Sequence, residues 1–156
     1  MALTKKQKQI IKEVHNFVKK ECEGFAEDDV FSNHVLGVKN HAVYLAKYYK
    51  ANEFIAIIAA YLHDIHYIQT ENHGIHEIEG GKFAKTYLKK LGLPDKEIGL
   101  IAKCILHHRG SRKRRRVSIE EKIIASADAM DHVSRFQHMF YWQSKTMGYH
   151  QAMLWM

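Results

Sequence analysis

The sequence contains twelve histidines among 156 residues, and this unusual number directs attention to metal chemistry. The clearest local feature is the pair His63-Asp64, which ends an apolar run from Phe54 to Leu62. An ionised carboxylate at the end of such a run costs free energy unless it is paired or bound to a metal. An imidazole and a carboxylate that are adjacent in the sequence can bind one metal ion together. For an isolated pair, the alternative is a helix that simply reaches solvent at residue 63.

Two further segments place a potential ligand beside a predicted buried helix face. Asp128 lies between two alanines in the segment IIASADAM, where aliphatic residues mark the buried side. His34 begins a segment whose apolar residues recur at intervals of three and four, as in a helix that packs on a core. Two imidazoles and two carboxylates suit Mn, Fe, Co, Ni or Zn better than Mg or Ca. We therefore expect a divalent transition metal whose ligands are His34, His63, Asp64 and Asp128.

The elements that must position these residues are helices. One proline and nine glycines leave few breaks, and most of the chain has helical periodicity. The pattern predicts an all-α fold, a single compact bundle of about six to seven helices that forms one domain over residues 1–156. The predicted helices cover about 4–22, 34–49, 54–65, 75–91, 95–108, the stretch from 118 through Asp128, and 135–156.

Caps and composition refine this prediction. Thr4 with Gln7 and Ser118 with Glu121 fit capping boxes, and Asn52 is a suitable N-cap for the helix that follows it. That helix is apolar on every face, which places it at the centre of the bundle.

These helices and ligands resemble the HD-domain metal-dependent phosphohydrolases over about residues 33–133. Three segments carry the resemblance: the helix that begins at His34, the alanine-rich helix that ends in His63-Asp64, and the aliphatic-Ala-Asp segment of Asp128. Their order and spacing are similar to those of the family. The resemblance implies a bundle of the HD-domain type, flanked by the helices 4–22 and 135–156, and the same four metal ligands.

The chain also departs from the family's pattern. Many members have arginine at the position of Gly37, and many have Gly-Lys where this chain has His66-Tyr67. That lysine is associated with phosphate contact. The sequence also lacks the Gly-Tyr-Pro signature of the branch that hydrolyses cyclic dinucleotides.

Family members with two metals carry further histidines between the His-Asp pair and the last aspartate. His76, four residues before Gly80, and the pair His107-His108 match this arrangement. The resemblance leaves one metal or two metals open. A second metal would be bound by His76, His107 and His108, with His73 as the alternative to His76.

The resemblance implies a metal-dependent phosphohydrolase that cleaves a phosphate ester or phosphoanhydride, of a nucleotide, by attack of a metal-activated water. Asp64 or Asp128 would bridge to this water or orient it. If His107 does not bind a second metal, it would donate a proton to the leaving oxygen. Three alternatives stay open: a di-iron oxygenase of the same fold, a non-catalytic nucleotide or nucleic-acid binding protein with a structural metal, and an interaction protein with a decayed site.

The formal charge of +7 favours an anionic partner, and we expect a small phosphorylated substrate ahead of nucleic acid. A basic loop, 109–116, follows His108 directly, and its Arg109 and Arg112 are the predicted phosphate-binding residues. The alternative is a solvated loop that contributes only net charge.

The remaining features concern location and association. No apolar run approaches the roughly 20 residues that cross a bilayer, and no signal-peptide core follows the N-terminus, so we expect a cytoplasmic protein without membrane contact. Cys22 and Cys104 match no metal or redox pattern and are predicted to be reduced. An apolar stripe in 135–156 predicts either core or a homodimer face; its members are Met139, Phe140, Tyr141, Trp142, Met153, Leu154 and Trp155.

Overall fold

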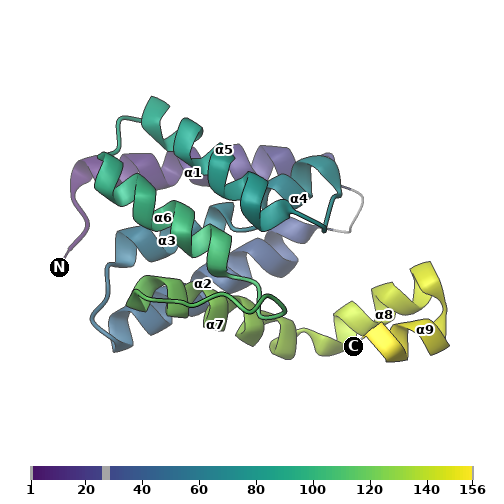
Figure 1. Cartoon of the computed structure of the whole chain (residues 1–156). Coiled ribbons are helices and arrows are strands. Elements are labelled where there is room, and N and C mark those ends of the chain that lie inside the picture. The colour runs from purple at the N-terminus through teal and green to yellow at the C-terminus, as the bar shows by residue number, and fades with distance from the viewer. Residues whose placement is uncertain (1, 26–28, 156) are drawn as a thin grey trace.

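The computed structural model describes residues 2–25 and 29–155, and these residues form α-helices, one short π-helical segment and no strand. The all-α bundle predicted from the sequence is thereby confirmed (Figure 1). In chain order, the elements are α1 (Lys5–Cys22), η1 (Phe31–Val35), α2 (Leu36–Tyr48), α3 (Glu53–Leu62), α4 (Ile65–Thr70), α5 (His76–Lys90), α6 (Asp95–His107), α7 (Ile119–Ser134), α8 (Phe136–Met147) and α9 (Tyr149–Trp155).

Three helices begin as the sequence predicts. The side chains of Thr4 and Ser118 accept hydrogen bonds from the amides of Gln7 and Glu121, whose own side chains accept from the cap amides in return. Asn52 caps α3 in a similar way through its side-chain oxygen. These bonds satisfy amides that have no partner within the helix, and they fix where α1, α3 and α7 start.

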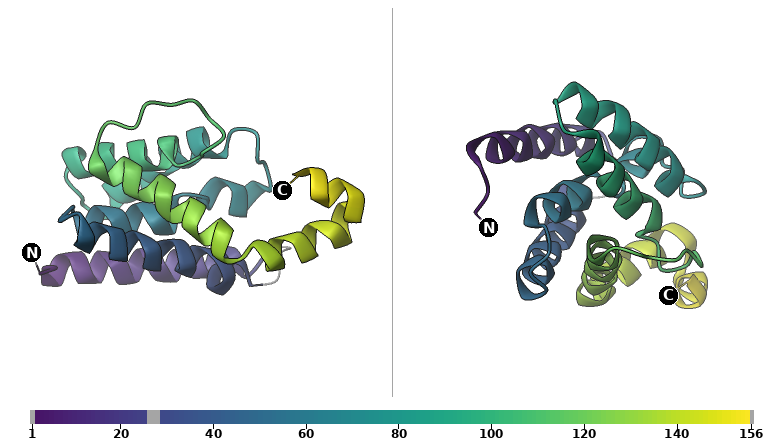
Figure 2. Two further views of the ribbon diagram at one scale, coloured as in Figure 1. Left: turned by 90° about the horizontal axis from the view of Figure 1, so that it is seen from below. Right: turned by 60° about the vertical axis from the view of Figure 1, so that its left-hand side comes forward.

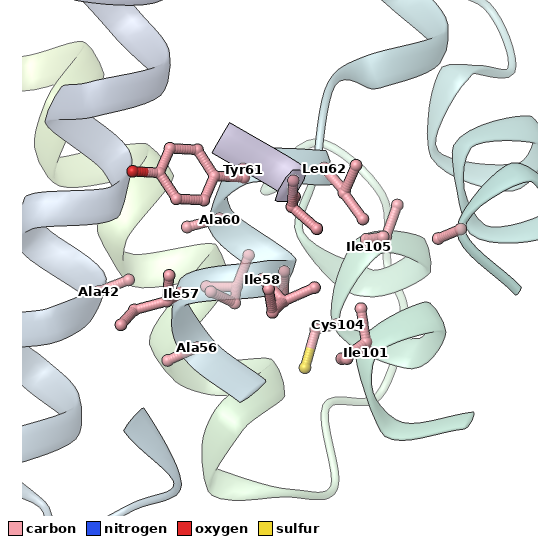
Figure 3. Close-up of a cluster of buried hydrophobic side chains, with 14 of the residues drawn as sticks. Ala42, Ala56, Ile57, Ile58, Ala60, Tyr61, Leu62, Ile101, Cys104 and Ile105 are labelled. Carbon is pink, nitrogen blue, oxygen red and sulfur yellow. The ribbon is translucent and has the colours of Figure 1, made fainter. Parts of the chain in front are cut away.

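Helix α3 lies at the centre of the bundle. Every residue from Phe54 to Leu62 is buried, and the helix contacts α1, α2, α6 and α7. Figure 3 shows Ala42 of α2 on one side of α3, and Ile101 and Ile105 of α6 on another. The central position inferred from the apolar faces is confirmed. As a result, His63 and Asp64 follow directly from the most buried helix of the molecule.

The structure differs from the predicted helices in several places. The helix expected over 34–49 begins in the π-helical segment η1 and becomes α-helical at Leu36. The helix expected over 54–65 ends at Leu62, because the backbone of Asp64 leaves the helical region (φ −108°, ψ 13°) and α4 starts behind it. The helix expected over 135–156 is divided into α8 and α9 at Gly148, which has φ 84°, a conformation that glycine adopts at little cost. The break at Asp64 matters for the site, because it places His63 and Asp64 between two helices, at the C-cap of α3 and the N-cap of α4.

Helices α8 and α9 extend away from the end of α7 and pack on each other (Figures 1 and 2). Tyr141 and Met153 of the predicted apolar stripe are 53% and 55% exposed, so these two do not belong to the core. The side chains of Met139, Trp142, Leu154 and Trp155 lie outside the described residues. A homodimer face on this segment stays a prediction.

Cys22 and Cys104 are both buried and form no disulfide, in agreement with the reduced state expected for them. Burial raises the pKa of each thiol, and that of Cys22 reaches about 12. Within the described part of the chain, none of the helices combines the length and the hydropathy needed to cross a membrane.

Candidate metal centre

The four predicted metal ligands come from three separate regions that packing brings together. His34 lies in η1, His63 and Asp64 follow α3, and Asp128 lies in the middle of α7. Helix α2, which continues from η1, packs along α7, and α3 contacts both of them. All four residues therefore lie where η1, the end of α3 and the middle of α7 meet.

The four side chains direct one atom each toward a common point. Nε2 of His34 is 3.1 Å from Nε2 of His63, 3.5 Å from Oδ2 of Asp64 and 3.7 Å from Oδ1 of Asp128. Nε2 of His63 is 3.3 Å and 3.8 Å from the same two oxygens. Ligands that lie about 2.0–2.2 Å from a shared ion lie roughly 3 to 4 Å from one another. We call His34, His63, Asp64 and Asp128 the first ligand group.

A second set of ligands joins the first through Asp64. Oδ1 of Asp64 is 3.1 Å from Nε2 of His76 and 3.4 Å from Nε2 of His108, and the two nitrogens are 3.3 Å apart. We call Asp64, His76 and His108 the second ligand group. Among the described residues it is His76, rather than the alternative His73, that belongs to this group. The carboxylate of Asp64 thus presents one oxygen to each group.

Two of these carboxylate oxygens fit a bound cation better than any other partner. Oδ1 of Asp64 and Oδ1 of Asp128 are buried and have no hydrogen-bond donor among the described residues. A buried charged oxygen without a partner is strongly unfavourable, and a metal ion in contact with it removes this cost. The donor set of imidazoles and carboxylates therefore fits a divalent transition metal.

Each histidine of the two groups also has a partner for its other ring nitrogen. Because carbonyl and carboxylate oxygens only accept, Nδ1 donates in every case, and Nε2 is the nitrogen that can bind a metal once it has lost its proton. The acceptors are Ala60 O for His63 (2.8 Å), His73 O for His76 (3.1 Å), Ile105 O for His108 (2.7 Å) and Asp131 Oδ2 for His34 (2.7 Å).

The electrostatics of the first ligand group follow from its burial and its mixed charges. Burial by itself would lower the pKa of His34, but hydrogen bonds and charges of Asp131, Asp64 and Asp128 raise it to about 10. The pKa of His63 is raised against burial by the charge of Asp64. Burial would raise the pKa of Asp64, and the charge of His63 and the hydrogen bonds from the surrounding histidines hold it well below its ordinary value. Metal binding must therefore displace protons from the imidazoles.

The structure does not bring His107 to the second ligand group. Its Nδ1 is 2.5 Å from Oε2 of Glu121, which also accepts from the amide of Val117. Burial would raise the pKa of Glu121, but the bonds with His107 and with the backbone hold it below its ordinary value. Successive residues of a helix point about 100° apart, so His107 and His108 face different neighbours. The sequence could not decide which of the two faces the core.

The structure places Arg109 and Arg112 against a buried carboxylate that the sequence had not singled out. Glu77, whose side chain is 1% exposed, lies 3.3 to 3.4 Å from the guanidinium groups of Arg109, Arg112 and Arg114. Arg109 and Arg112 also donate to the backbone carbonyls of residues 73 and 74. These bonds attach the basic loop to the start of α5, next to His76. Three guanidinium groups around one carboxylate leave an excess of positive charge there.

Two residues of α7 lie at the first ligand group without having been predicted as site residues. Asp131 contacts Nδ1 of His34, as described above. His132 lies one turn after Asp128, with Nε2 at 3.6 Å from Oδ1 of that residue, and its ring stacks on His34 at 5.2 Å between centroids. The spacing of four residues from Asp128 was the available sequence signal for His132. Its side chain is 48% exposed, so it forms the solvent side of the group.

Comparison with known proteins agrees with this geometry. The model of the HD domain family matches residues 31–132, a span that contains both ligand groups. A solved structure described as a predicted HD superfamily hydrolase, from an uncultured Thermotogales bacterium, is similar with a TM-score of 0.69 and 27% sequence identity. The similarity covers 83% of this chain and 74% of that one. No curated protein matches the chain. Because the family model covers well over half of the 156 residues, the chain belongs to the HD domain family, as its three motif segments predicted.

Proposed function

We propose that this HD domain protein is a two-metal phosphohydrolase that cleaves a phosphate ester or phosphoanhydride of a nucleotide. The observation that carries the proposal is the carboxylate of Asp64, whose Oδ2 faces the first ligand group and whose Oδ1 faces the second. A carboxylate shared in this way suits two ions held close together, the arrangement that stabilises attacking and leaving oxygens in phosphoryl transfer. The relative from Thermotogales, described as a predicted hydrolase, supports the same reaction class.

Different residues of the chain have different roles in such a reaction. When bound, divalent metals supply Lewis-acid stabilisation of a phosphoryl oxygen and a water of lowered pKa. The chain holds four Nε2 atoms and two carboxylates toward the centre, with every Nδ1 bonded outward. The side chain of Asp64 is 17% exposed, which leaves it accessible to water. We assign it the predicted role of orienting that water.

Proton transfer to the leaving oxygen needs a residue at the solvent side of the centre. His107 was the candidate from the sequence, but its Nδ1 is bonded to Glu121 and it belongs to neither ligand group. His132 is 48% exposed and contacts Asp128, so we assign it the contact with the substrate's leaving group ahead of His107. Burial lowers the pKa of His132, so its imidazole carries a proton to donate chiefly on the acid side of neutral pH.

We propose a nucleotide as the substrate because the protein is positively charged near the site. The chain carries a formal charge of +7, and the excess positive charge around Glu77 lies directly next to His76 of the second ligand group. Guanidinium groups that already share one carboxylate keep free N–H donors for a phosphate. Arg112 is the most open of the three, with 47% of its side chain exposed. We therefore keep Arg109 and Arg112 as the proposed phosphate contacts.

The experiment that tests this proposal measures both the bound metal and the rate of phosphate release. The metal-free chain is loaded separately with Mn, Fe, Co, Ni or Zn, its bound metal is measured by elemental analysis, and phosphate release is followed on a panel of nucleotides. We expect two ions per chain and turnover with at least one metal. Asp64→Asn should lose both the metal and the turnover, while His150→Ala, an exposed histidine of α9, should keep both. An Asp64→Asn chain with full activity would contradict the proposal, and oxygen consumption by a two-iron form without phosphate release would replace it by the oxygenase.

A further inference from the structure

Asp131 is outside both ligand groups, yet its carboxylate bonds directly to one of their members. Its Oδ2 lies 2.7 Å from Nδ1 of His34, a residue 97 positions away in the sequence. The side chain of Asp131 is 2% exposed. Arg135, one turn further along α7, donates its Nε to the same oxygen at 2.8 Å. Both contacts therefore involve Oδ2 of Asp131.

Gly37 provides the space that Asp131 occupies. A Cβ at residue 37 would lie 1.8 Å from Oδ1 and 2.9 Å from Cγ of Asp131, far inside van der Waals contact. The φ of Gly37 is not in the left-handed region, so its backbone does not require glycine. Glycine inside a helix such as α2 is unfavourable relative to alanine. Its presence is therefore explained by the neighbouring carboxylate of Asp131.

The ring of His34 is held by a residue distant in the sequence, unlike the other three imidazoles. His63, His76 and His108 each donate Nδ1 to the carbonyl three residues before them, so their own backbone fixes the ring. His34 lies in the short π-helical segment η1, and its acceptor comes from α7 on the far side of the group. A carboxylate acceptor also increases the electron density on the opposite nitrogen, the one that binds metal.

We propose that Asp131 is the positioning residue of His34, with Gly37 as the space that admits its carboxylate and Arg135 as the cation that holds it in place. The contact keeps Nε2 of His34 directed at Asp64 and Asp128. This inference rests on the metal-binding function proposed above. It predicts that the three residues control the affinity of the first ligand group without touching the ion.

The test measures the affinity for Zn²⁺ alone, by competition with a chromophoric chelator, on metal-free protein. Loss of an outer partner of a ligand typically costs roughly 10- to 100-fold in metal affinity, and we expect this loss for one of the two ions in Asp131→Asn and Asp131→Ala. The visible spectrum of the Co²⁺ form should change at the same ion, which a purely structural effect would not produce. Circular dichroism checks that each variant is folded. If Asp131→Ala does not fold, the test relies on Asp131→Asn, whose side chain has the same shape as aspartate.

Gly37 allows a double-mutant cycle. Gly37→Ala should weaken zinc binding as Asp131→Ala does, whereas in the Asp131→Ala background it should have little further effect, because no carboxylate is left to displace. Gly99→Ala is the matched control, since Gly99 also lies inside a helix and a Cβ there meets nothing within 4 Å. Equal losses from Gly37→Ala in both backgrounds, or zinc affinity unchanged in Asp131→Ala, would overturn the proposal.

A further readout needs no metal. The Nδ1 proton of His34 should give a downfield proton resonance in the unaltered chain, and this resonance should be lost in Asp131→Ala. Its absence from the unaltered chain would also overturn the proposal. A chain that binds zinc through this contact but hydrolyses no phosphate ester would remove the proposed hydrolase function and leave the role of Asp131 intact, so the two failures are distinguishable.

Discussion

The two ligand groups share Asp64 but are stabilised in different ways. In the second group, His76 and His108 lie at helix ends and donate Nδ1 to carbonyls three residues earlier, so local backbone fixes both rings. In the first group, His34 depends on Asp131, 97 residues away, and therefore on how α2 packs along α7. Mutations that change only the packing of helices should therefore lower the metal affinity of the first group more than that of the second group.

The largest effects are expected from substitutions of a ligand that belongs to only one of the two groups. Asp128→Asn should leave the second group loaded, whereas His76→Gln should leave the first group loaded, because each residue serves one group only. Each variant should retain one ion per chain by elemental analysis. Turnover should fall in both by more than the roughly 100-fold that loss of an outer partner costs. If either variant loses both ions, the two groups do not bind metal independently.

A substitution of Glu77 tests how much the ion pairs next to the second group stabilise the protein. Its carboxylate is buried among three guanidinium groups, and Glu77→Gln would leave their charges without a counter-ion. Since the arginines are partly exposed, solvent screens part of this effect, and we expect a loss of about 1–3 kcal/mol in the free energy of unfolding. Urea denaturation of the metal-free protein measures it. Glu53→Gln, at the first residue of α3, is the control for removal of one negative charge.

The same carboxylate should make the protein sensitive to acid. Burial would raise the pKa of Glu77, but its hydrogen bonds and the charge of Arg109 hold it below the ordinary value of 4.5. A carboxyl group with a depressed folded pKa contributes stability above its ordinary pKa and loses that contribution as the pH falls through the folded value. The difference in stability between the unaltered chain and Glu77→Gln should therefore shrink below about pH 4.5. A constant difference down to pH 3 would show that the charge of Glu77 is not the cause.

The pKa of His34 predicts that the metal-free chain loses stability at alkaline pH, whereas Glu77 predicts a loss at acid pH. Its pKa is about 10 in the folded, metal-free chain against an ordinary value of 6.5. The stability that this proton contributes is fully present below pH 6.5 and is lost as the pH rises through about 10. The metal-free chain should therefore become less stable between these values, and His34→Gln should flatten the curve. Zinc affinity should rise over the same range, because fewer protons compete with the ion.

The four ligands of the first group were predictable from the sequence, and their outer partners were not. His34, the His63-Asp64 pair and Asp128 each lie next to an apolar stripe, so their approach to a core follows from periodicity. Asp131 resembles any polar residue late in a helix, and only the tertiary packing of α2 on α7 shows that it reaches His34.

Glu77 and the boundaries of the helices illustrate the same limit. Glu77 resembles an ordinary acidic residue in the first turn of a helix, and its three arginines belong to a loop 32 to 37 residues further along the chain. The division of the last helix at Gly148 did have a local signal, because glycine favours helix ends. By contrast, no glycine or proline marks the end of α3 before Asp64.

The smallest expected effect comes from Gly81, which lies where α5 packs on α6, the helices next to His76 and His108. A Cβ at Gly81 would lie 3.3 Å from the carbonyl oxygen of Ala102, a contact that α5 and α6 can relieve by moving apart by a few tenths of an ångström. Gly81→Ala should therefore weaken zinc binding to the second group by only about 2- to 5-fold, well below the loss expected for a broken ligand contact. The first group should keep its affinity, because its ligands come from other elements. If Gly81→Ala costs as much as Gly37→Ala, the second group depends on packing as strongly as the first, and local backbone does not explain its geometry.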